Sequence, residues 1–367
     1  MHAAKDAIKA AVVARTMPPW QAASGCNEYR ADFSLTEEQI DTVQRWSDAG
    51  GPLGDPNATP IVVTHESLAI SRVDYELQLP TPYIPKSFPD DYRCFFLDWP
   101  ATETLYATGF GVQPGNTAIV HHAIGYVVRA ENIATFQALD DADSEPGWPC
   151  FGGPGGSTSG PPPASWLAGW APGITGVDFP KGTGIEIPVG AKVIVQMHYN
   201  SMKMDPAPDQ TKVLLSVEKS VEKRAAILPF TNFQWVFGGK MNIPARSNDV
   251  VHTYAGDPTT IVNTVTGGAI AAGKPLTLYN VGFHMHTLGQ RITGHMLRAD
   301  GTDECLAEIP RWNFHWQQLY TFAKPKVVNP GDRLELECEW DNPSASDVNW
   351  GESTSDEMCL APYYVTE

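Results

Sequence analysis

The sequence of 367 residues has few basic side chains: 25 Lys and Arg stand against 42 Asp and Glu, giving a formal net charge of −17. Nucleic acids and anionic membranes attract proteins with basic surfaces, so this balance argues against both kinds of partner. No uninterrupted apolar run of about 18 residues occurs, and we therefore expect no membrane insertion. Hydrophobic residues still make up 42% of the chain, which excludes a disordered protein and allows sizeable cores.

Closely spaced cysteine pairs are also absent. No CxxC occurs, so the spacing typical of many zinc sites and of haem attachment is missing. An even number of widely spaced cysteines fits a disulfide framework better, and disulfides form in oxidising compartments. No signal peptide is visible at Met1, which is compatible with a leader that has been removed, and we expect a periplasmic or secreted protein. The six cysteines are Cys26, Cys94, Cys150, Cys305, Cys338 and Cys359.

The chain divides into a helical beginning and a long β-rich remainder. We predict helices near residues 3–15 and 34–50, followed by a linker rich in Gly and Pro. From about Ile61, short β-rich runs alternate with Pro and Gly turns, which is typical of β-sandwiches. We therefore predict a mainly β protein with a helical segment (1–56) and two antiparallel, jelly-roll-like sandwiches (57–224 and 225–367).

The stretch YNVGFHMHTLG contains the clearest group of candidate ligands. Read with a period of two, its apolar side chains share one strand face: Tyr279, Val281, Phe283 and Met285. The opposite face carries His284 and His286, and two imidazoles on one face can bind one metal ion. Two polar residues on a solvent-exposed face are the alternative.

Met358, in the stretch STSDEMC, is a candidate third ligand. A thioether is a soft donor that favours copper(I) over zinc or magnesium, although a buried core methionine is the simpler alternative. A bridge between Cys338 and Cys359 would close a loop of about 20 residues, contribute roughly 3 kcal/mol in the chain-entropy model, and fix Met358 in place.

Three further histidines lie within apolar strands: His121 and His122 in VHHAI, and His198 in VQMHYN. A single buried histidine is usually a satisfied core residue, but three in this context suggest one three-imidazole site. Neighbours on a regular strand point to opposite faces. His121 and His122 can share an ion only if the strand bends or ends there, one then coordinating through Nδ1 and the other through Nε2.

Together these motifs resemble the copper type II, ascorbate-dependent monooxygenases, the group of peptidylglycine α-hydroxylating monooxygenase and dopamine β-monooxygenase. The order HH, QxHY, HxH and STSDEMC matches, over roughly residues 69–366. The resemblance implies two sandwiches, each holding one copper, across a solvent-filled cleft. The electron-transfer copper would be held by His121, His122 and His198. The copper that binds O2 and oxidises a substrate C–H bond would be held by His284, His286 and Met358, which act as the catalytic residues.

The resemblance also implies roles outside the ligands. Tyr92 and Gln196 look similar to residues that support the first copper. Two family disulfides would join Cys94 to Cys150 and Cys338 to Cys359. Cys26 and Cys305 have no family partner that we can assign, and a bridge between them is one alternative that the sequence leaves open.

Three positions depart from the peptidylglycine enzymes. Those enzymes bind the substrate carboxylate with an Arg before HxH and with Asn and Tyr after the Met-Cys pair, where this chain has Gly282, Leu360 and Pro362. We therefore expect a small-molecule substrate that is less polar than a glycine-extended peptide.

The beginning of the chain resembles the second half of a bacterial c-type cytochrome module, through ARTMPPW and LTEEQIDTVQRWSDAGG. Met17 would be the axial haem ligand, provided that a CxxCH lies upstream of this sequence; a haem-free relic is the alternative. The intact bacterial protein would then take electrons from that haem c, in place of an ascorbate-like donor.

Two other functions fit the same residues: a non-catalytic periplasmic protein for copper binding or electron transfer, and a zinc hydrolase or lyase that uses the three imidazoles. The remaining histidines have simpler explanations. We expect His2, His65 and His252 to be exposed, His315 to pack among aromatic rings, and His295 to lie outside the site. Glu352, Asp356 and Glu357 are expected to form a solvated turn, with one of them as a candidate for orienting a ligand.

Overall fold

The computed structural model describes residues 2–55, 57, 59, 67–150, 153–155, 163–172, 176–202, 205–314, 316–351 and 353–367. The chain is mainly β, which confirms the predicted sandwich class. None of the helices in the described ranges is long and apolar enough to cross a membrane. His65, His315, Glu352 and most of the Gly/Pro loop at 152–165 lie outside the described residues, as does the side chain of His2.

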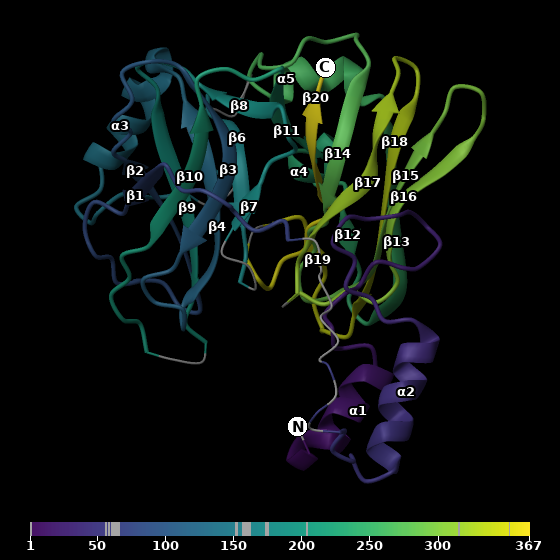
Figure 1. Ribbon diagram of the computed structural model, residues 1–367. Helices are drawn as coiled ribbons and strands as arrows, with labels where there is room; N and C mark the ends of the chain where they lie inside the picture. The colour runs from purple at the N-terminus through teal and green to yellow at the C-terminus, as the bar shows by residue number, and fades with distance from the viewer. Residues whose placement is uncertain are drawn as a thin grey trace.

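The N-terminal helices lie apart from the sheets, at one end of the molecule (Figure 1). They are the short 3-10 helix η1 (His2–Ala4), α1 (Lys5–Val13) and α2 (Glu37–Asp48). Thr36 begins α2 with a capping box, because its hydroxyl accepts the backbone N–H of Gln39 while the Gln39 side chain accepts that of Thr36. Gly50 and Gly51 follow its end with positive φ angles.

The first sandwich pairs a five-stranded sheet with one half of a nine-stranded sheet. The five strands, in order, are β5 (Trp148–Pro149), β2 (Asp90–Leu97), β9 (Lys192–Asn200), β4 (Val120–Val128) and β6 (Ser165–Trp170). The facing strands are β1 (Tyr75–Gln78), β10 (Lys212–Glu218), β3 (Leu105–Gln113) and β8 (Thr183–Ile187), with β7 (Gly176–Asp178) beside β3. Phe95 and Val195 from the first sheet meet Phe110 and Leu215 from the second in one buried core.

The second sandwich pairs a four-stranded sheet with the other half of the same nine-stranded sheet. The four strands are β13 (Ser247–Gly256), β18 (Arg333–Asn342), β15 (Gly289–Leu297) and β16 (Asp303–Ile309). The facing strands are β11 (Lys223–Phe230), β20 (Ala361–Thr366), β14 (Leu276–Gly282) and β17 (Leu319–Val328). Along β18 every second residue is buried, from Leu334 to Asn342, as expected for a strand with one face on a core.

Short elements complete the fold. They are η2 (Ala130–Asn132), α3 (Ile133–Asp141), α4 (Phe233–Val236), α5 (Pro258–Val265) and the two-stranded pair β12 (Asn242–Ile243) and β19 (Val348–Asn349).

The two sandwiches are joined through one continuous sheet. β8 of the first pairs in parallel with β11 of the second, through Thr183 and Lys223 among others. The expected boundary at residue 224 falls within β11, so the three-part division of the chain stays a prediction. A shared sheet restricts how far the two halves can move relative to each other, because hydrogen bonds cross between them.

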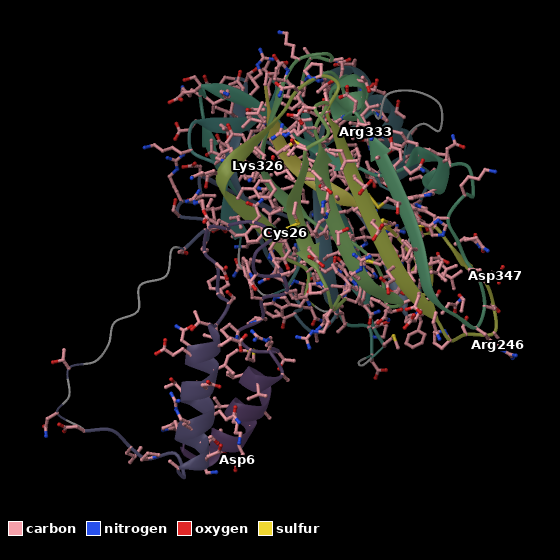
Figure 2. The ribbon with its side chains drawn as sticks, turned by 90° about the vertical axis from the view of Figure 1, so that its right-hand side faces the viewer. Asp6, Cys26, Arg246, Lys326, Arg333 and Asp347 are labelled. Carbon is pink, nitrogen blue, oxygen red and sulfur yellow. A yellow bond between two sulfur atoms is a disulfide. The ribbon has the colours of Figure 1, made fainter. Side chains whose placement is uncertain are left out.

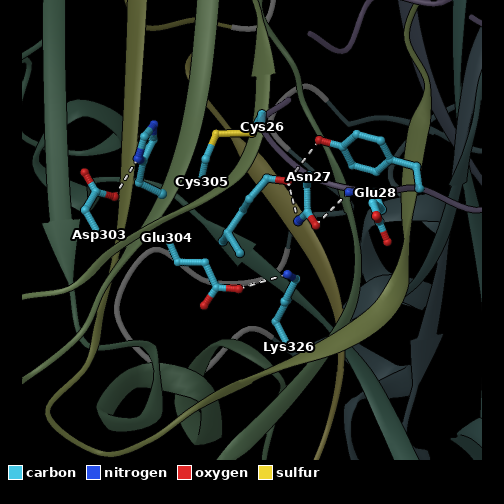
Figure 3. The surroundings of a disulfide bond; sticks show 10 residues. Cys26, Asn27, Glu28, Asp303, Glu304, Cys305 and Lys326 are labelled. Carbon is cyan, nitrogen blue, oxygen red and sulfur yellow. Dashed lines mark hydrogen bonds and ion pairs between the residues drawn. A yellow bond between two sulfur atoms is a disulfide. The ribbon is translucent and has the colours of Figure 1, made fainter. Parts of the chain in front are cut away.

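The segment after α1 is fastened to the second sandwich. Cys26 forms a disulfide with Cys305 on β16, and the Asn27 side chain beside it donates to the Leu306 carbonyl (Figure 3). Tyr29 packs into the core of the second sandwich. Figure 2 shows the two helices projecting away below Cys26.

Candidate functional site

Three imidazoles converge at the end of the five-stranded sheet. His121 and His122 lie on β4, and His198 lies on β9 directly opposite His122. The Nδ1 atom of His121 is 3.2 Å from that of His122 and 3.1 Å from that of His198, and the third side of the triangle measures 3.2 Å. Three nitrogen atoms that meet at one point form a metal-binding arrangement. We call these three residues the first site.

A β-bulge brings the two adjacent histidines to the same point. The pairing of β4 with β9 shifts register between Val120 and His122, which bends the strand where regular geometry would separate the side chains. We expected one Nδ1 and one Nε2 donor from His121 and His122; the structure instead turns Nδ1 of both rings, and of His198, toward the centre.

His198 is held in one orientation and one tautomer. Tyr92 stacks on its ring with centroids 4.1 Å apart and planes 8° apart. Its Nε2 lies 2.8 Å from Asp90 Oδ1, and because an ionised carboxylate only accepts, Nε2 carries the proton. The Nδ1 lone pair of His198 therefore faces the other two histidines, as a metal ligand requires.

Burial favours the neutral form of two imidazoles of the first site, His122 and His198. Desolvation lowers the pKa of His122 well below its usual value, and the neighbouring His198 and His121 lower it further. Desolvation also lowers the pKa of His198, although Asp90 acts in the opposite direction. Burial alone would raise the pKa of Asp90, but hydrogen bonds from His198, Asn200 and Thr354 outweigh it and bring the pKa to about 2. The result is a carboxylate beside neutral imidazoles.

A second pair of imidazoles follows the end of β14. His284 Nδ1 lies 2.7 Å from Gln317 Oε1, and His286 Nδ1 lies 3.0 Å from the Asp356 carbonyl oxygen. Both oxygens accept, so each Nδ1 carries the proton and each Nε2 presents its lone pair. Desolvation lowers the pKa of His284, and it lowers that of His286 to about 3, so both rings are neutral ligands.

The backbone of Met358 is tied to that of His286 through a shared acceptor. An antiparallel bridge joins His284 to Leu360, which sets residue 286 opposite residue 358. The Glu357 carboxylate accepts the backbone N–H groups of both His286 and Met358, at 2.9 and 3.3 Å. The Met358 side chain is buried, and the neighbouring Cys359 is bridged to Cys338. His284 and His286 thus present two nitrogen donors, and Met358, the candidate third ligand, shares the Glu357 carboxylate with His286 through its backbone N–H. We call these three residues the second site.

The two sites adjoin each other. The ring centroids of His122 and His284 are 6.4 Å apart. Phe314 bridges the sites on another side, since its ring stacks on His121 at 5.0 Å and meets His286 edge-on at 5.9 Å. The family resemblance implies a solvent-filled cleft between the two copper sites; in this structure the rings of His122 and His284 approach each other directly.

Two residues, Glu357 and His252, lie in surroundings that differ from those predicted, and a third, Gln196, has a contact that the sequence does not reveal. Glu357 is fully buried rather than part of a solvated turn, and it supports the second site through backbone contacts. His252, expected to be exposed, is half-buried between Trp235 and Trp340. Gln196 is buried and donates to the Cys150 carbonyl at 2.6 Å, beside the Cys94–Cys150 disulfide, so it supports the strand two residues before His198.

The remaining predicted residues lie outside both sites. His295 pairs with Asp303 on the edge of β15 and β16, in agreement with a role outside the site. Met17 is 53% exposed, shortly after the end of α1. Sequence reasoning missed Asp90, Gln317 and Phe314, because each approaches its histidine from a distant part of the chain.

Sequence comparison identifies known proteins that are similar to this chain. Residues 233–366 match the model of the C-terminal domain of copper type II ascorbate-dependent monooxygenases. Human dopamine beta-hydroxylase is 23% identical over 278 residues, which cover 72% of this chain and 41% of that protein. Human DBH-like monooxygenase protein 1 is 29% identical over 96 residues, 25% of this chain and 16% of that protein. The chain thus spans less than half the length of these relatives.

Solved structures add little. The infectious bursal disease virus VP2 subviral particle covers 82% of this chain and 74% of its own at 11% identity, but its TM-score of 0.19 is too low to define a shared fold. The sequence matches thus point to similarity with the copper type II ascorbate-dependent monooxygenases, over residues 233–366 in the family model.

Proposed function

We propose that this protein is a dicopper monooxygenase that hydroxylates a C–H bond of a small molecule. One atom of O2 enters the C–H bond and the other leaves as water, so the balance requires two electrons and two protons from a reductant. The observation that carries the proposal is the convergence of three imidazole nitrogens beside a second pair of imidazoles, with the ring centroids of His122 and His284 6.4 Å apart. The family match of residues 233–366 supports the same conclusion.

The donor sets fit copper. Neutral imidazoles suit copper ions, and a thioether favours the reduced ion, whereas magnesium and calcium prefer oxygen ligands. When bound, copper supplies one-electron redox chemistry and a position for O2. We assign the first site, His121, His122 and His198, to the electron-transfer ion, because all its donors are nitrogen. We assign the second site, His284, His286 and Met358, to the ion where O2 and substrate react.

The protein's own residues prepare both sites before an ion binds. Asp90 and Tyr92 hold His198 so that Nδ1 faces inward. Gln317 and the Asp356 carbonyl hold the protons on Nδ1 of His284 and His286, which keeps each Nε2 free of hydrogen. Such partners typically change metal affinity by 10- to 100-fold when they are removed.

The surroundings of the second site favour a substrate without a carboxylate. Gly282 lies near Leu319 and Pro362, where a Cβ atom would stand 3.6 and 3.5 Å from their side-chain carbons. These apolar neighbours offer no charged partner to a carboxylate. Efficient conversion of a glycine-extended peptide would contradict this proposal. Because a Cβ atom at residue 282 would make only ordinary van der Waals contacts, Gly282→Arg is a usable test, and the added guanidinium should raise the affinity for carboxylate-bearing ligands relative to the parent.

The electron donor and the compartment complete the proposal. We propose that residues 1–56 belong to a cytochrome c-like module of a bacterial protein, with Met17 as axial ligand of a haem c that reduces the first site. Met17 is exposed, and a natural gene without CxxCH upstream of this sequence would overturn this part. Three disulfides support a periplasmic or secreted location.

Copper content tests the central claim. The metal-free protein is loaded with copper, dialysed and assayed for metal per chain, together with His121→Ala, Met358→Ile and the control His295→Ala. We expect two coppers in the parent and in the control, and the loss of one in each site variant. Met358→Ile should also reduce substrate-dependent O2 consumption by orders of magnitude while the first site stays loaded.

The same experiment separates the alternatives. Two bound coppers without O2 consumption across a broad substrate screen would favour a non-catalytic copper-binding or electron-transfer protein. A strong preference for zinc, with no redox response, would favour a hydrolase or lyase built on the three imidazoles. A single copper per chain would contradict the two-site assignment.

A further inference from the structure

One oxygen of the Asp90 carboxylate is hydrogen-bonded both to a histidine of the first site and to the loop that precedes Met358 of the second site. Oδ1 of Asp90, at the start of β2 in the first sandwich, accepts three hydrogen bonds. Two come from its own sheet: His198 Nε2 at 2.8 Å and Asn200 Nδ2 at 2.8 Å. The third comes from the Thr354 hydroxyl at 3.0 Å, which belongs to the loop before Met358 and lies 264 residues away in sequence. The Asp90 side chain is only 8% exposed, so water competes weakly for this oxygen.

The loop that carries Thr354 is bound to the second site at its other end. The Asp356 carbonyl accepts the Nδ1–H of His286, and Asp356 N–H donates to the Ser353 carbonyl at 2.8 Å within the same turn. Thr287, next to His286, also donates its hydroxyl to the Thr354 carbonyl at 3.4 Å. Hydrogen bonds therefore connect His198 through Asp90 to Thr354, and the short chain segment from Thr354 to Asp356 leads to the Asp356 carbonyl that accepts from His286.

We propose that Asp90 and Thr354 are positioning residues that couple the two sites, so that binding of a metal ion at His198 stabilises the loop that holds His286 and Met358. The identity of the ion rests on the proposed function above, whereas the hydrogen bonds do not. We call this pair the Asp90–Thr354 link. The link forms a contact between the two sandwiches directly at His198. A change in the position of His198 is therefore transmitted to the loop of the second site.

The direction of the coupling follows from hydrogen-bond chemistry. An ion on Nδ1 withdraws electron density from the imidazole, which makes the Nε2–H a stronger donor and orients the carboxylate more firmly. Asp90 then presents Oδ1 in a fixed position to the Thr354 hydroxyl. The loop gains order without any new contact, because its existing bond to Asp90 fluctuates less.

Amide hydrogen exchange of the loop tests the Asp90–Thr354 link. The experiment uses the full chain in a Met358→Ile background, which restricts copper to the first site, with and without copper. We expect copper to slow exchange of the Asp356 and Glu357 amides by about tenfold, as the strengthening of one charge-assisted hydrogen bond allows. Thr354→Val, which keeps the shape and removes the hydroxyl, should abolish this slowing. Thr354→Ser, which keeps the hydroxyl, should retain it.

A matched control and a spectrum exclude a merely structural effect. Thr253→Val removes another threonine-to-carboxylate hydrogen bond, to Glu337 at 3.0 Å on β18, and should leave the copper-dependent slowing intact. The paramagnetic resonance spectrum of copper(II) at the first site should change in Thr354→Val and return to the parent's in Thr354→Ser. Equal slowing in Thr354→Val and in the parent would overturn the link.

The outcome also distinguishes the two proposals. If the background binds copper at the first site but Thr354→Val behaves as the parent does, the link fails while the dicopper assignment stands. If the background binds no copper at the first site, the metal assay shows that the proposed function fails, and the coupling fails with it. If coupling is observed but the unmutated chain consumes no O2, the link stands without the monooxygenase activity.

Discussion

The carboxylate of Glu357 accepts the backbone N–H of His286 at 2.9 Å. The same side chain also accepts the N–H groups of Leu288 and Met358 and the indole N–H of Trp340, at 2.6, 3.3 and 2.9 Å. It is fully buried, and desolvation raises its pKa to about 7 even though these four donors act to lower it. Glu357 thus fixes the backbone of His286 and Met358, two residues of the second site, by accepting their N–H groups.

Replacing Glu357 with Gln should weaken both the fold and the second site. The amide supplies one acceptor oxygen instead of two and turns its NH2 toward a backbone donor, so at least one buried N–H is left unpaired. We expect a loss of about 1–3 kcal/mol in the free energy of unfolding and a roughly 10- to 100-fold loss of copper affinity at the second site only. Urea denaturation and metal competition measure the two effects.

The control for this prediction is Glu76→Gln, which removes an exposed ion pair with Lys212 on β1 and β10. Such pairs contribute about 0–1 kcal/mol, so the control should match the parent in copper affinity and nearly in stability. If Glu357→Gln also matched the parent, the supporting role of Glu357 would be wrong.

Gln317→Leu tests the orientation of His284. Leucine keeps the approximate size but removes the acceptor of the Nδ1–H, so His284 can take the other tautomer or rotate. We expect copper affinity at the second site to fall by about 10- to 100-fold, with little change at the first site. Gln317→Glu, which retains an acceptor, should recover much of the affinity. Gln137→Leu on α3, which loses only a bond to Asp141, is the matched control.

The strands and the ligand candidates were accessible from the sequence because both depend on local spacing. Alternation of apolar and polar residues predicts a strand such as β18 and assigns its buried face. The motifs around His121, His198 and His284 single out residues that the structure brings together. Adjacent histidines were the difficult case, and the bulge at Val120 and His122 explains how a strand satisfies both.

The partners of the histidines could not be predicted, for a physical reason. Gln317 and Asp90 reach His284 and His198 across 33 and 108 residues, and nothing in the local sequence distinguishes them from other polar side chains. The parallel pairing of β8 with β11 is equally non-local. Glu357 was misread because an acidic residue in a polar stretch resembles a solvated turn, while its burial depends on donors such as Trp340 from other strands.

The Cys26–Cys305 disulfide should stabilise the protein without controlling copper. It closes a separation of 279 residues, and the double variant Cys26→Ser/Cys305→Ser should lose about 2–5 kcal/mol in unfolding free energy. The N-terminal segment should nevertheless stay in place, because Ala23 and Arg30 donate backbone hydrogen bonds to Glu308 and Thr321. Copper content should remain at two per chain. Loss of copper in this variant would show that the bridge organises a site.

Without metal, the protein should lose stability as the pH falls below about 6.5. In the folded state the pKa of His286 is about 3, below its ordinary value of 6.5, and burial also lowers the pKa of His122, His198 and His284. Between these values the unfolded chain binds protons that the folded chain does not, so the free energy of unfolding decreases as the pH falls, by up to about 1.4 kcal/mol per pH unit for each such histidine.

Glu357 opposes this trend, since its pKa is raised to about 7 and the folded state binds its proton first, but one carboxyl stands against four imidazoles. Denaturant unfolding of the metal-free protein at about pH 7.5, 6 and 5 measures the slope. His286→Asn removes one of the titrating groups. Between pH 6 and 5 it should reduce the dependence of the unfolding free energy on pH by nearly the contribution of one bound proton, about 1.4 kcal/mol per pH unit. A slope that is the same in the parent and in His286→Asn would contradict the assignment of a neutral, buried His286.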